Sequence, residues 1–546
     1  MALFFAVICR TGPKSAAIAF QTLSQNSYNL RAHPSVSSST SWRRFATVVG
    51  HSTDSESASR SSVQESEALP TVILKRSNQS RNFRNGNQLV FTKAIQKITG
   101  AGKQGPSMGQ LVQIKVEPDA PKKKKTDAPP TKGPPQDPKP IFLGWGVYNP
   151  ESLYRVRILC HRYLLPTHKF QSMDRFIESS TESEALGIIL RHQFAKAWST
   201  RQALQLPSPP LSDKNDGDQP LFFHVNRTDT FRLVNGEGDQ VSGLAIDVIG
   251  GETAVVMSSA AWCEIHKDTI LDSLESILPS HIQTVWKTTP TRLVQDGYSA
   301  TPTSDDVEDD AVEEDRLVLS LENGIQYATF PFRDGQKTGV YCDQRENRLS
   351  LAPYCRNQRV LDLCCYHGGF SLNAVIHGGA AHATGVDSSQ DAVDVCWQNA
   401  DLNECREKVD FVRSDIAAFL QDAHQREGEF YDVIILDPPK LAPSVSGLDK
   451  ARRKYHSFNR DAMKLIDPVK GGLLLTCTCS AAMTQKDGGQ YFLNMVQGAA
   501  LACGREVTLL KVSGAAPCHT QSPVSFPAGA YLTAALFRVH PIENEL

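Results

Sequence analysis

The stretch RVLDLCCYHGGFSLNAVIHGGAAHATGVD, residues 359–387, decides the fold of this chain. It begins with the apolar run 360–363, which has the length of a buried strand. A glycine-containing turn over residues 366–369 follows, and then an apolar pattern with helical spacing. A second apolar segment ends at Asp387. This order of strand, glycine turn, helix, second strand and terminal acid predicts one βαβ unit that can hold an adenosine nucleoside. The carboxylate of Asp387 can accept hydrogen bonds from both ribose hydroxyls of that nucleoside.

The glycine turn distinguishes between two kinds of nucleoside pocket. A dinucleotide site requires the pattern G-x-G-x-x-G, and the turn reads D-L-C-C-Y-H-G-G-F, so NAD is the weaker choice. The turn resembles motif I of the class I S-adenosylmethionine (SAM) methyltransferases, and this resemblance implies SAM as the cofactor. The alternative is an ordinary doubly wound sheet with a tight turn. The candidate pocket residues of this unit are Asp362, Tyr366, Gly368, Gly369, Phe370 and Asp387.

The composition is that of a set of globular domains. The 546 residues leave room for about two to four domains, and 40% of them are hydrophobic. Because the net charge is only -2, any nucleic-acid contact must come from local basic patches. No apolar run approaches the roughly 18 residues of a membrane span, so no membrane contact is expected. The 13 cysteines contain no C-x-x-C pair, which predicts neither a metal site nor a disulfide framework and favours a reducing compartment.

The N-terminal region has the composition of an organelle-import presequence. Residues 1–53 contain five basic residues and many serines, but no Asp or Glu. The sequence R-R-F-A at 43–46 resembles the cleavage pattern of mitochondrial presequences. We therefore expect residues 1–69 to be a mitochondrial presequence and a disordered linker; a plastid presequence and a merely disordered tail are the alternatives.

Residues 70–160 are predicted to form a small β-domain. Short β runs are separated by Gly and polar turns, and a Lys/Pro-rich insert at 117–140 is expected to be a disordered loop. The order of N-Q-L-V-F, a G-Q-L-V strand and F-L-G-W-G-V-Y-N-P resembles a PUA domain, an RNA-binding pseudobarrel. A basic β-domain without a ligand is the alternative. The resemblance implies RNA contacts for Arg76, Arg81 and Arg84.

Residues 161–300 are predicted to form an α+β connector domain. A helical region precedes several strand-like runs, among which we count the short apolar segment 292–294. An acidic insert at 301–316, also expected to be disordered, separates this domain from the C-terminal domain, residues 317–546.

The C-terminal domain shows the regular alternation of a parallel, doubly wound α/β sheet. Strands are expected near 359–363, 382–386, 409–412, 432–436 and 472–477. Ligands bind such sheets at the carboxyl ends of the strands. Asp387 ends the second strand and is expected to hold the ribose. Asp415 follows the third strand, where class I methyltransferases often place an acid near the adenine amino group.

Asp437-Pro-Pro-Lys440 follows the fourth strand. Two prolines after an acid predict a rigid turn, because proline fixes φ and cannot extend the sheet. Methyltransferases that modify exocyclic amines use an aromatic residue after the prolines to stack on the flipped base. Lys440 occupies that place here, which argues against amine methylation.

Two cysteines at the end of the fifth strand, Cys477 and Cys479, indicate the reaction class. Cytosine C5 is too poor in electrons to attack SAM, but addition of a thiolate to C6 makes C5 nucleophilic. Asp437 can hydrogen-bond the N3/N4 edge of the base and stabilise this adduct.

The whole set of motifs resembles the RlmI family of 23S rRNA (cytosine-5) methyltransferases. K-T-G-V-Y-C-D-Q-R at 337–345 precedes motif I as it does in that family, and implies SAM-pocket roles for Gln344 or Arg345. The family's nucleophilic cysteine corresponds to Cys479; the alternatives are Cys477 and a structural role for both. The basic segment 450–460 can follow RNA phosphates or form a solvated helix face. The RNA-contact candidates of this half are Lys440, Arg452, Arg453 and Tyr455.

The sequence thus predicts a SAM-dependent enzyme that makes 5-methylcytosine in structured RNA, most simply organelle large-subunit rRNA, without a metal. Cys479 and Asp437 are its predicted catalytic residues, and a homodimer is an open possibility. Guanine or adenine methylation, which the D-P-P turn favours, is one alternative. A SAM-binding assembly factor without catalysis is the other.

Overall fold

The computed structural model describes residues 68–76, 82–118, 139–208, 227–299, 316–333, 338–426, 428–442, 444–523 and 526–542. The predictions for the presequence and for most of the two inserts lie outside these residues, as does the prediction for Arg81. None of the described helices is long and apolar enough to cross a membrane.

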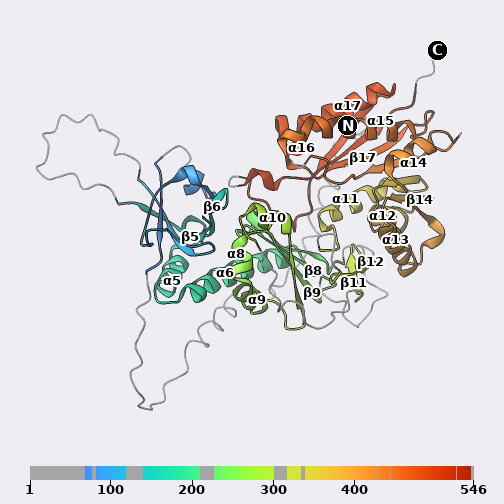
Figure 1. Cartoon of the computed structure of the whole chain (residues 1–546). Helices are drawn as coiled ribbons and strands as arrows, with labels where there is room; N and C mark the ends of the chain where they lie inside the picture. Colours follow the sequence, from blue (N-terminus) through green and yellow to red (C-terminus); the bar gives the residue numbers. More distant parts are fainter. Residues whose placement is uncertain are drawn as a thin grey trace, which may run out of the picture. The chain divides into compact units, whose positions relative to one another are not determined.

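The first part of the described chain is a six-stranded sheet (Figure 1). Its strands are β1 (Thr71–Leu74), β2 (Leu89–Phe91), β3 (Ile95–Thr99), β4 (Leu111–Val116), β5 (Ile141–Tyr148) and β6 (Tyr154–His161), in the order β2-β6-β5-β4-β1-β3. Gly146 lets β5 and β6 approach, because a Cβ there would lie 2.3 Å from the carbonyl oxygen of Arg157. Alternate side chains such as Val112 and Ile114 fill a core on one face. The predicted β-domain is therefore present as a mixed sheet.

The connector is an α+β unit. Helices α5 (Thr167–Glu178) and α6 (Glu182–Ala203) precede a four-stranded sheet, β10-β9-β8-β7, made of β7 (Phe231–Asn235), β8 (Leu244–Ile249), β9 (Thr253–Ser258) and β10 (Gln283–Thr288). Helices α8 (Ala261–Ile265), α9 (Lys267–Glu275) and α10 (Pro290–Gln295) complete it. The prediction that 292–294 is extended is wrong, because Pro290 at the first helical position starts α10. One apolar core joins Trp145 and Leu159 of the first sheet to α6 and β7–β9.

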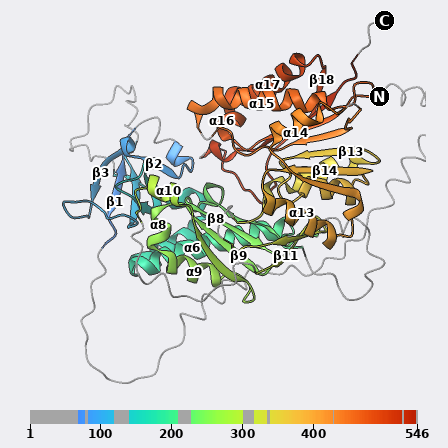
Figure 2. The ribbon, with the colours of Figure 1, turned by 45° about the vertical axis from the view of Figure 1, so that its right-hand side comes forward.

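The C-terminal domain contains a seven-stranded sheet with the order β15-β14-β13-β16-β17-β19-β18. The strands are β13 (Arg359–Leu363), β14 (His382–Asp387), β15 (Val409–Arg413), β16 (Val433–Leu436), β17 (Gly472–Thr478), β18 (Val507–Ser513) and β19 (Thr533–Val539). The first five are parallel, as predicted, and β19 runs antiparallel to both of its neighbours. Figure 2 shows β13 and β14 side by side. This is the class I methyltransferase arrangement.

Helices cover both faces of this sheet because each strand carries apolar side chains on both sides. Helices α11 (Arg345–Leu351), α12 (Gly369–Ile376) and α13 (Gln390–Leu402) contribute to one core with Val360 and Ile435. Helices α14 (Ile416–Ala423), α15 (Leu448–Lys464) and α17 (Gln490–Ala502) contribute to the other with Leu361 and Ile434. A hairpin of β11 (Val318–Glu322) and β12 (Ile325–Thr329) lies at the start of the domain, before the first strand of the large sheet.

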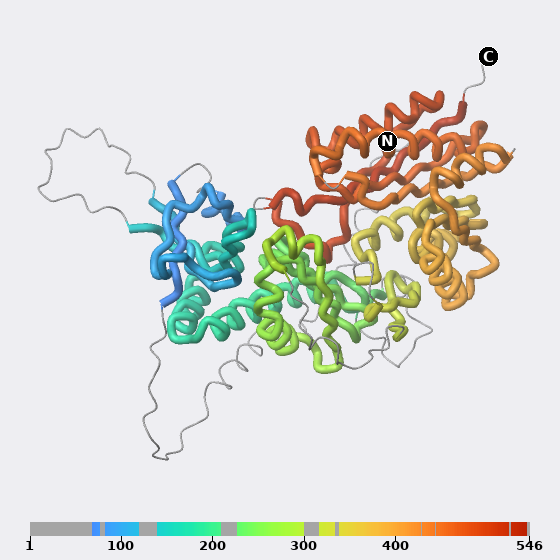
Figure 3. The backbone as a smooth tube through the Cα atoms, viewed as in Figure 1, coloured from blue at the N-terminus to red at the C-terminus, as the bar shows by residue number. Residues whose placement is uncertain are grey.

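The segment 514–532 connects β18 to β19, contains no named strand among its described residues and is drawn in red in Figure 3. It contacts the connector through Cys518, whose carbonyl oxygen accepts from Arg201 Nη2 at 2.6 Å, and through Thr520, whose carbonyl oxygen accepts from Asn235 Nδ2 at 2.8 Å. This segment thereby links the C-terminal domain to the connector.

Candidate active site

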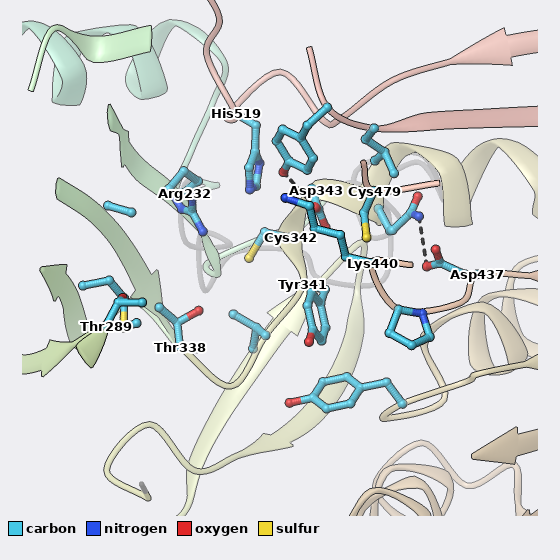
Figure 4. Close-up of a pocket in the computed structure, with 18 of the residues that line it drawn as sticks. Arg232, Thr289, Thr338, Tyr341, Cys342, Asp343, Asp437, Lys440, Cys479 and His519 are labelled. Atoms are coloured by element: carbon cyan, nitrogen blue, oxygen red, sulfur yellow. Dashed lines mark hydrogen bonds between the residues drawn. The ribbon is translucent and has the colours of Figure 1, made fainter. Parts of the chain in front are cut away.

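A cavity of about 1640 Å³ lies at the carboxyl ends of the parallel strands. The segments that follow β13, β14, β15, β16 and β17 all contribute to its wall. The rest of the wall includes residues 152–154 and 157 of the first sheet, residues between 330 and 348, and residues of the connector and of the segment 514–532 (Figure 4). The cavity is therefore where an open α/β sheet binds its ligand.

The glycine turn and Asp387 form one end of the cavity. The backbone N–H of Tyr366 donates to Asp387 Oδ2 at 3.0 Å, and that of Ser389 donates to Oδ1 at 3.0 Å. Gly369 and Phe370, at the start of α12, line the same end. Asp415 lines it too, and its side chain caps α14 by accepting from the backbone N–H of Ala417 at 2.8 Å. The two predicted acids thus face one cavity from neighbouring strands.

These residues fit a nucleoside that carries an amino-acid tail, as SAM does. Asp387 offers a carboxylate for ribose hydroxyls. A Cβ at Gly369 would lie 2.6 Å from Nε of Arg348, so only glycine leaves room beside this guanidinium. Arg348 lines the cavity and binds Glu322 and the carbonyl oxygen of Tyr341, but its buried Nε has no hydrogen-bond partner among the described residues. That donor suits an anionic group such as a carboxylate.

Cys479 and Asp437 also line the cavity (Figure 4). Cys479 follows β17 and is partly exposed to the cavity, whereas Cys477 within the strand is fully buried in the core. Burial raises the pKa of the Cys477 thiol well above its ordinary value. Of the two cysteines, only Cys479 is therefore placed to meet a substrate.

Asp437 has an unusual carboxyl group. Burial raises its pKa to about 7, and the nearby carboxylate of Asp343 acts in the same direction, while Arg348 and a hydrogen bond from Gln344 oppose the shift. Gln344 Nε2 donates to Asp437 Oδ2 at 2.9 Å. Near neutral pH a large share of Asp437 carries a proton and can donate it to a ligand.

Several known methyltransferases are similar to this chain. A family model described as S-adenosylmethionine-dependent methyltransferase matches residues 284–497. The ribosomal RNA large subunit methyltransferase I of Salmonella typhimurium is 34% identical over 316 residues, which cover 57% of this chain and 73% of that enzyme. The chain belongs to this methyltransferase family. The enzyme of the same name from Salmonella arizonae is 33% identical over 320 residues, with the same coverage.

Two solved structures support the fold. A methyltransferase complexed with SAH is 20% identical, covers 86% of this chain and 99% of its own, and has a TM-score of 0.60. A SAM-dependent methyltransferase from Streptococcus mutans is also 20% identical, with a TM-score of 0.57 and coverage of 86% and 100%. The methyltransferase described here uses SAM as its cofactor.

Three predicted pocket residues of the methyltransferase do not line the cavity. Asp362 is fully buried, and its Oδ2 accepts from the backbone N–H and the hydroxyl of Ser371 at the start of α12. Gly368 instead provides the left-handed turn before α12, with φ of 77°. Arg345 turns away, and its Nη1 contacts the sulfur of Cys518. These three residues therefore support the backbone around the cavity and do not face a ligand. Gln344 does line the cavity.

The predicted RNA contacts divide into exposed and buried residues. Arg76, Arg452 and Arg453 are exposed, Arg84 is partly buried, and Lys440 is exposed at the rim of the cavity. The prediction for Tyr455 is wrong. It is fully buried in α15, and its hydroxyl lies 2.9 Å from the hydroxyl of Thr478. Lys454, on the same helix, lines the cavity instead.

The cavity residues that the sequence interpretation missed include two groups from outside the large sheet. The first comes from the connector and includes Arg232, Lys287 and Arg292. The second comes from the segment 514–532, for which no role was predicted from the sequence. The Tyr531 hydroxyl donates to Asp343 Oδ2 at 2.8 Å. A long irregular stretch rich in Gly and Pro between two strands is the sequence signal that pointed to it.

Proposed function

We propose that this methyltransferase forms 5-methylcytosine in large-subunit rRNA, with Cys479 as the nucleophile. The observation that carries the proposal is that Cys479, Asp437 and the nucleoside-binding end with Asp387 all face one cavity. Relatives 34% identical bear the name ribosomal RNA large subunit methyltransferase I. Lys440 and Lys454 line the cavity and offer positive charge to an RNA backbone.

Cys479 and Asp437 have different roles in the proposed reaction. The Cys479 thiolate adds to C6 of the cytosine ring, and the electron pair moves towards C5 and N3 while protonated Asp437 donates to the N3 edge. Bound SAM would supply an electrophilic methyl group, which C5 takes as the methyl–sulfur bond breaks and its electron pair stays on sulfur to give S-adenosylhomocysteine. Loss of the C5 proton to a base then returns the electron pair and expels the Cys479 thiolate, so the enzyme is regenerated.

The first prediction tests the nucleophile. We expect Cys479→Ala to lower methylation by about 10³-fold or more, since the covalent route is removed. Binding of SAH, measured by calorimetry, should stay within about threefold. Incubation of large-subunit rRNA with isotope-labelled SAM, followed by nucleoside mass spectrometry, gives the product.

Cys477→Ala is the matched control, because it removes the neighbouring thiol from the core and not from the cavity. It should lower stability more than activity. If Cys479→Ala still makes 5-methylcytosine, or if the wild-type product is a methylated purine, the proposal is refuted.

We further propose that the six-stranded N-terminal domain acts as a PUA-like RNA-binding module and that the protein works in mitochondria. The first idea rests on the exposed Arg76 and on the resemblance of its motifs, the second on the acid-free composition of residues 1–53. Expression of the full chain with a C-terminal fluorescent protein tests the proposed mitochondrial location. Plastid or cytosolic fluorescence would contradict it.

A further inference from the structure

A line of three hydrogen-bonded side chains leads away from the catalytic Asp437. Gln344 Nε2 donates to Asp437 Oδ2 at 2.9 Å. The Oε1 atom of the same glutamine accepts from Asn347 Nδ2 at 2.6 Å, and Asn347 Oδ1 accepts from the Ser513 hydroxyl at 2.7 Å. Gln344 and Asn347 are both buried. We call Gln344, Asn347 and Ser513 the relay.

The direction of every hydrogen bond in the relay is fixed by the backbone. Asn347 Nδ2 also donates at 3.1 Å to the carbonyl oxygen of Gly514, which can only accept. The nitrogen of the Asn347 amide must therefore point to Gly514 and Gln344, and its oxygen must point to Ser513. Gln344 then has to present its oxygen to Asn347 and its NH₂ group to Asp437.

This direction decides which oxygen of Asp437 can carry a proton. Oδ2 accepts from Gln344, so a proton on the carboxyl group belongs on Oδ1, which has no hydrogen-bond partner among the described residues. The charged groups around Asp437 come from several elements: Asp343 before α11, Asp362 on β13 and Arg348 on α11. Two acids against one guanidinium, together with burial, favour the neutral carboxyl group. The ionisable groups that also interact with it are Tyr341, Cys364, Tyr455 and Cys477.

We propose that the relay keeps the Asp437 proton on Oδ1 and thereby selects cytosine over uracil. The proposal rests on the cytosine reaction proposed above and names what determines its base specificity. N3 of cytosine is a bare acceptor and pairs with the Oδ1 hydroxyl, whereas N3 of uracil carries a hydrogen and would meet a second donor. A site built around one donor rejects a base that cannot accept from it. Gln344, Asn347 and Ser513 are positioning residues, since they act through Asp437.

Asn347→Asp reverses the relay with almost no change in shape. An acceptor then faces Gln344, so the glutamine amide turns and presents its oxygen to Asp437. The Asp437 proton moves to Oδ2, and Oδ1 becomes an acceptor. We expect kcat/KM for a cytosine target to fall about 10- to 100-fold and the preference for cytosine over uracil to fall at least about tenfold.

The readout uses the full chain and two rRNA transcripts that differ only in a cytosine or uracil at the mapped target, with 5-methylcytidine and 5-methyluridine measured by mass spectrometry. Asn403→Asp, at the end of α13 and outside the cavity, is the matched control for the added carboxylate. SAH binding and the melting temperature report whether the Asn347 variant is folded. A destabilised Asn347→Asp protein would still be judged by its ratio of the two products.

Gln344→Met supplies a second, independent measurement. It removes the donor that stabilises the charged carboxylate, so the pKa of Asp437 should rise and the basic limb of the pH–rate profile should move to higher pH. If both variants keep the basic limb of the wild-type pH–rate profile and the wild-type ratio of 5-methylcytidine to 5-methyluridine, the relay does not determine the base specificity. If wild-type enzyme makes no 5-methylcytidine at all, the proposed function itself fails, and this outcome is distinct.

Discussion

Asp437 shows how the position of a carboxyl group in the fold shifts its pKa. The turn after β16 puts it against the wall of the cavity, beside Asp343, with only Gln344 donating to it among the described residues. Its pKa of about 7 lies well above the ordinary value of 3.8. A pKa that is higher in the folded state means that the native protein binds the proton more tightly than the unfolded chain does.

The stability of the protein should therefore depend on this group between about pH 4 and pH 7. Stability from Asp437 is fully present below the unfolded pKa and is lost as the pH rises to the folded pKa. We expect Asp437→Asn, which stays neutral, to be more stable than wild type at pH 8 by about 1–3 kcal/mol, and the difference to shrink towards pH 4. Urea unfolding at both pH values measures it. An equal difference at both values would show that Asp437 does not titrate in this range.

At the scale of elements, the segment 514–532 depends on one buried ion pair in the connector. Arg201 is fully buried in α6 and binds both oxygens of Asp239, at 2.6 and 2.8 Å, as well as the carbonyl oxygen of Cys518. Thr520 also donates to Asp239 at 2.7 Å. The side chains that reach the cavity from this segment, such as Tyr531, are therefore held from the connector side.

Arg201→Ala should be strongly destabilising, because it leaves Asp239 buried without its cation. We expect a loss of about 3–5 kcal/mol in the free energy of unfolding and a lower kcat/KM. Arg426→Ala is the matched control, since its pair with Asp422 on α14 is exposed to solvent and should contribute little. Equal effects of the two substitutions would contradict a structural role for the buried pair.

Helix α15 shows what local sequence can and cannot predict. Leu448, Ala451, Tyr455 and Phe458 recur at helical spacing and form the buried face, so the position of Tyr455 was readable from periodicity. The basic residues between them drew the prediction towards RNA instead. The contact of Arg201 with Cys518 spans 317 positions and leaves no local pattern, so the sequence could not reveal it.

At the scale of the whole molecule, the five parallel strands could be predicted from hydrophobic runs and turn residues. The strand bounds agree to within about one residue because each buried run is short and ends at an acid or a turn. The connector's share of the cavity could not be predicted, since it arises only where separate domains meet. Cys479 and Asp437 could be placed at the cavity from the sequence because each follows a strand of the predicted sheet.

The position of the segment 514–532 in the chain also bears on synthesis. A ribosome makes the connector, the glycine turn and Cys479 well before this segment emerges from the exit tunnel. Until then the nascent chain lacks the Gly514 carbonyl that orients Asn347, the anchor on Arg201 and the tyrosine that contacts Asp343. The site is therefore complete only once this segment has been made, and a product that stops short of residue 514 would carry Cys479 in an unfinished site.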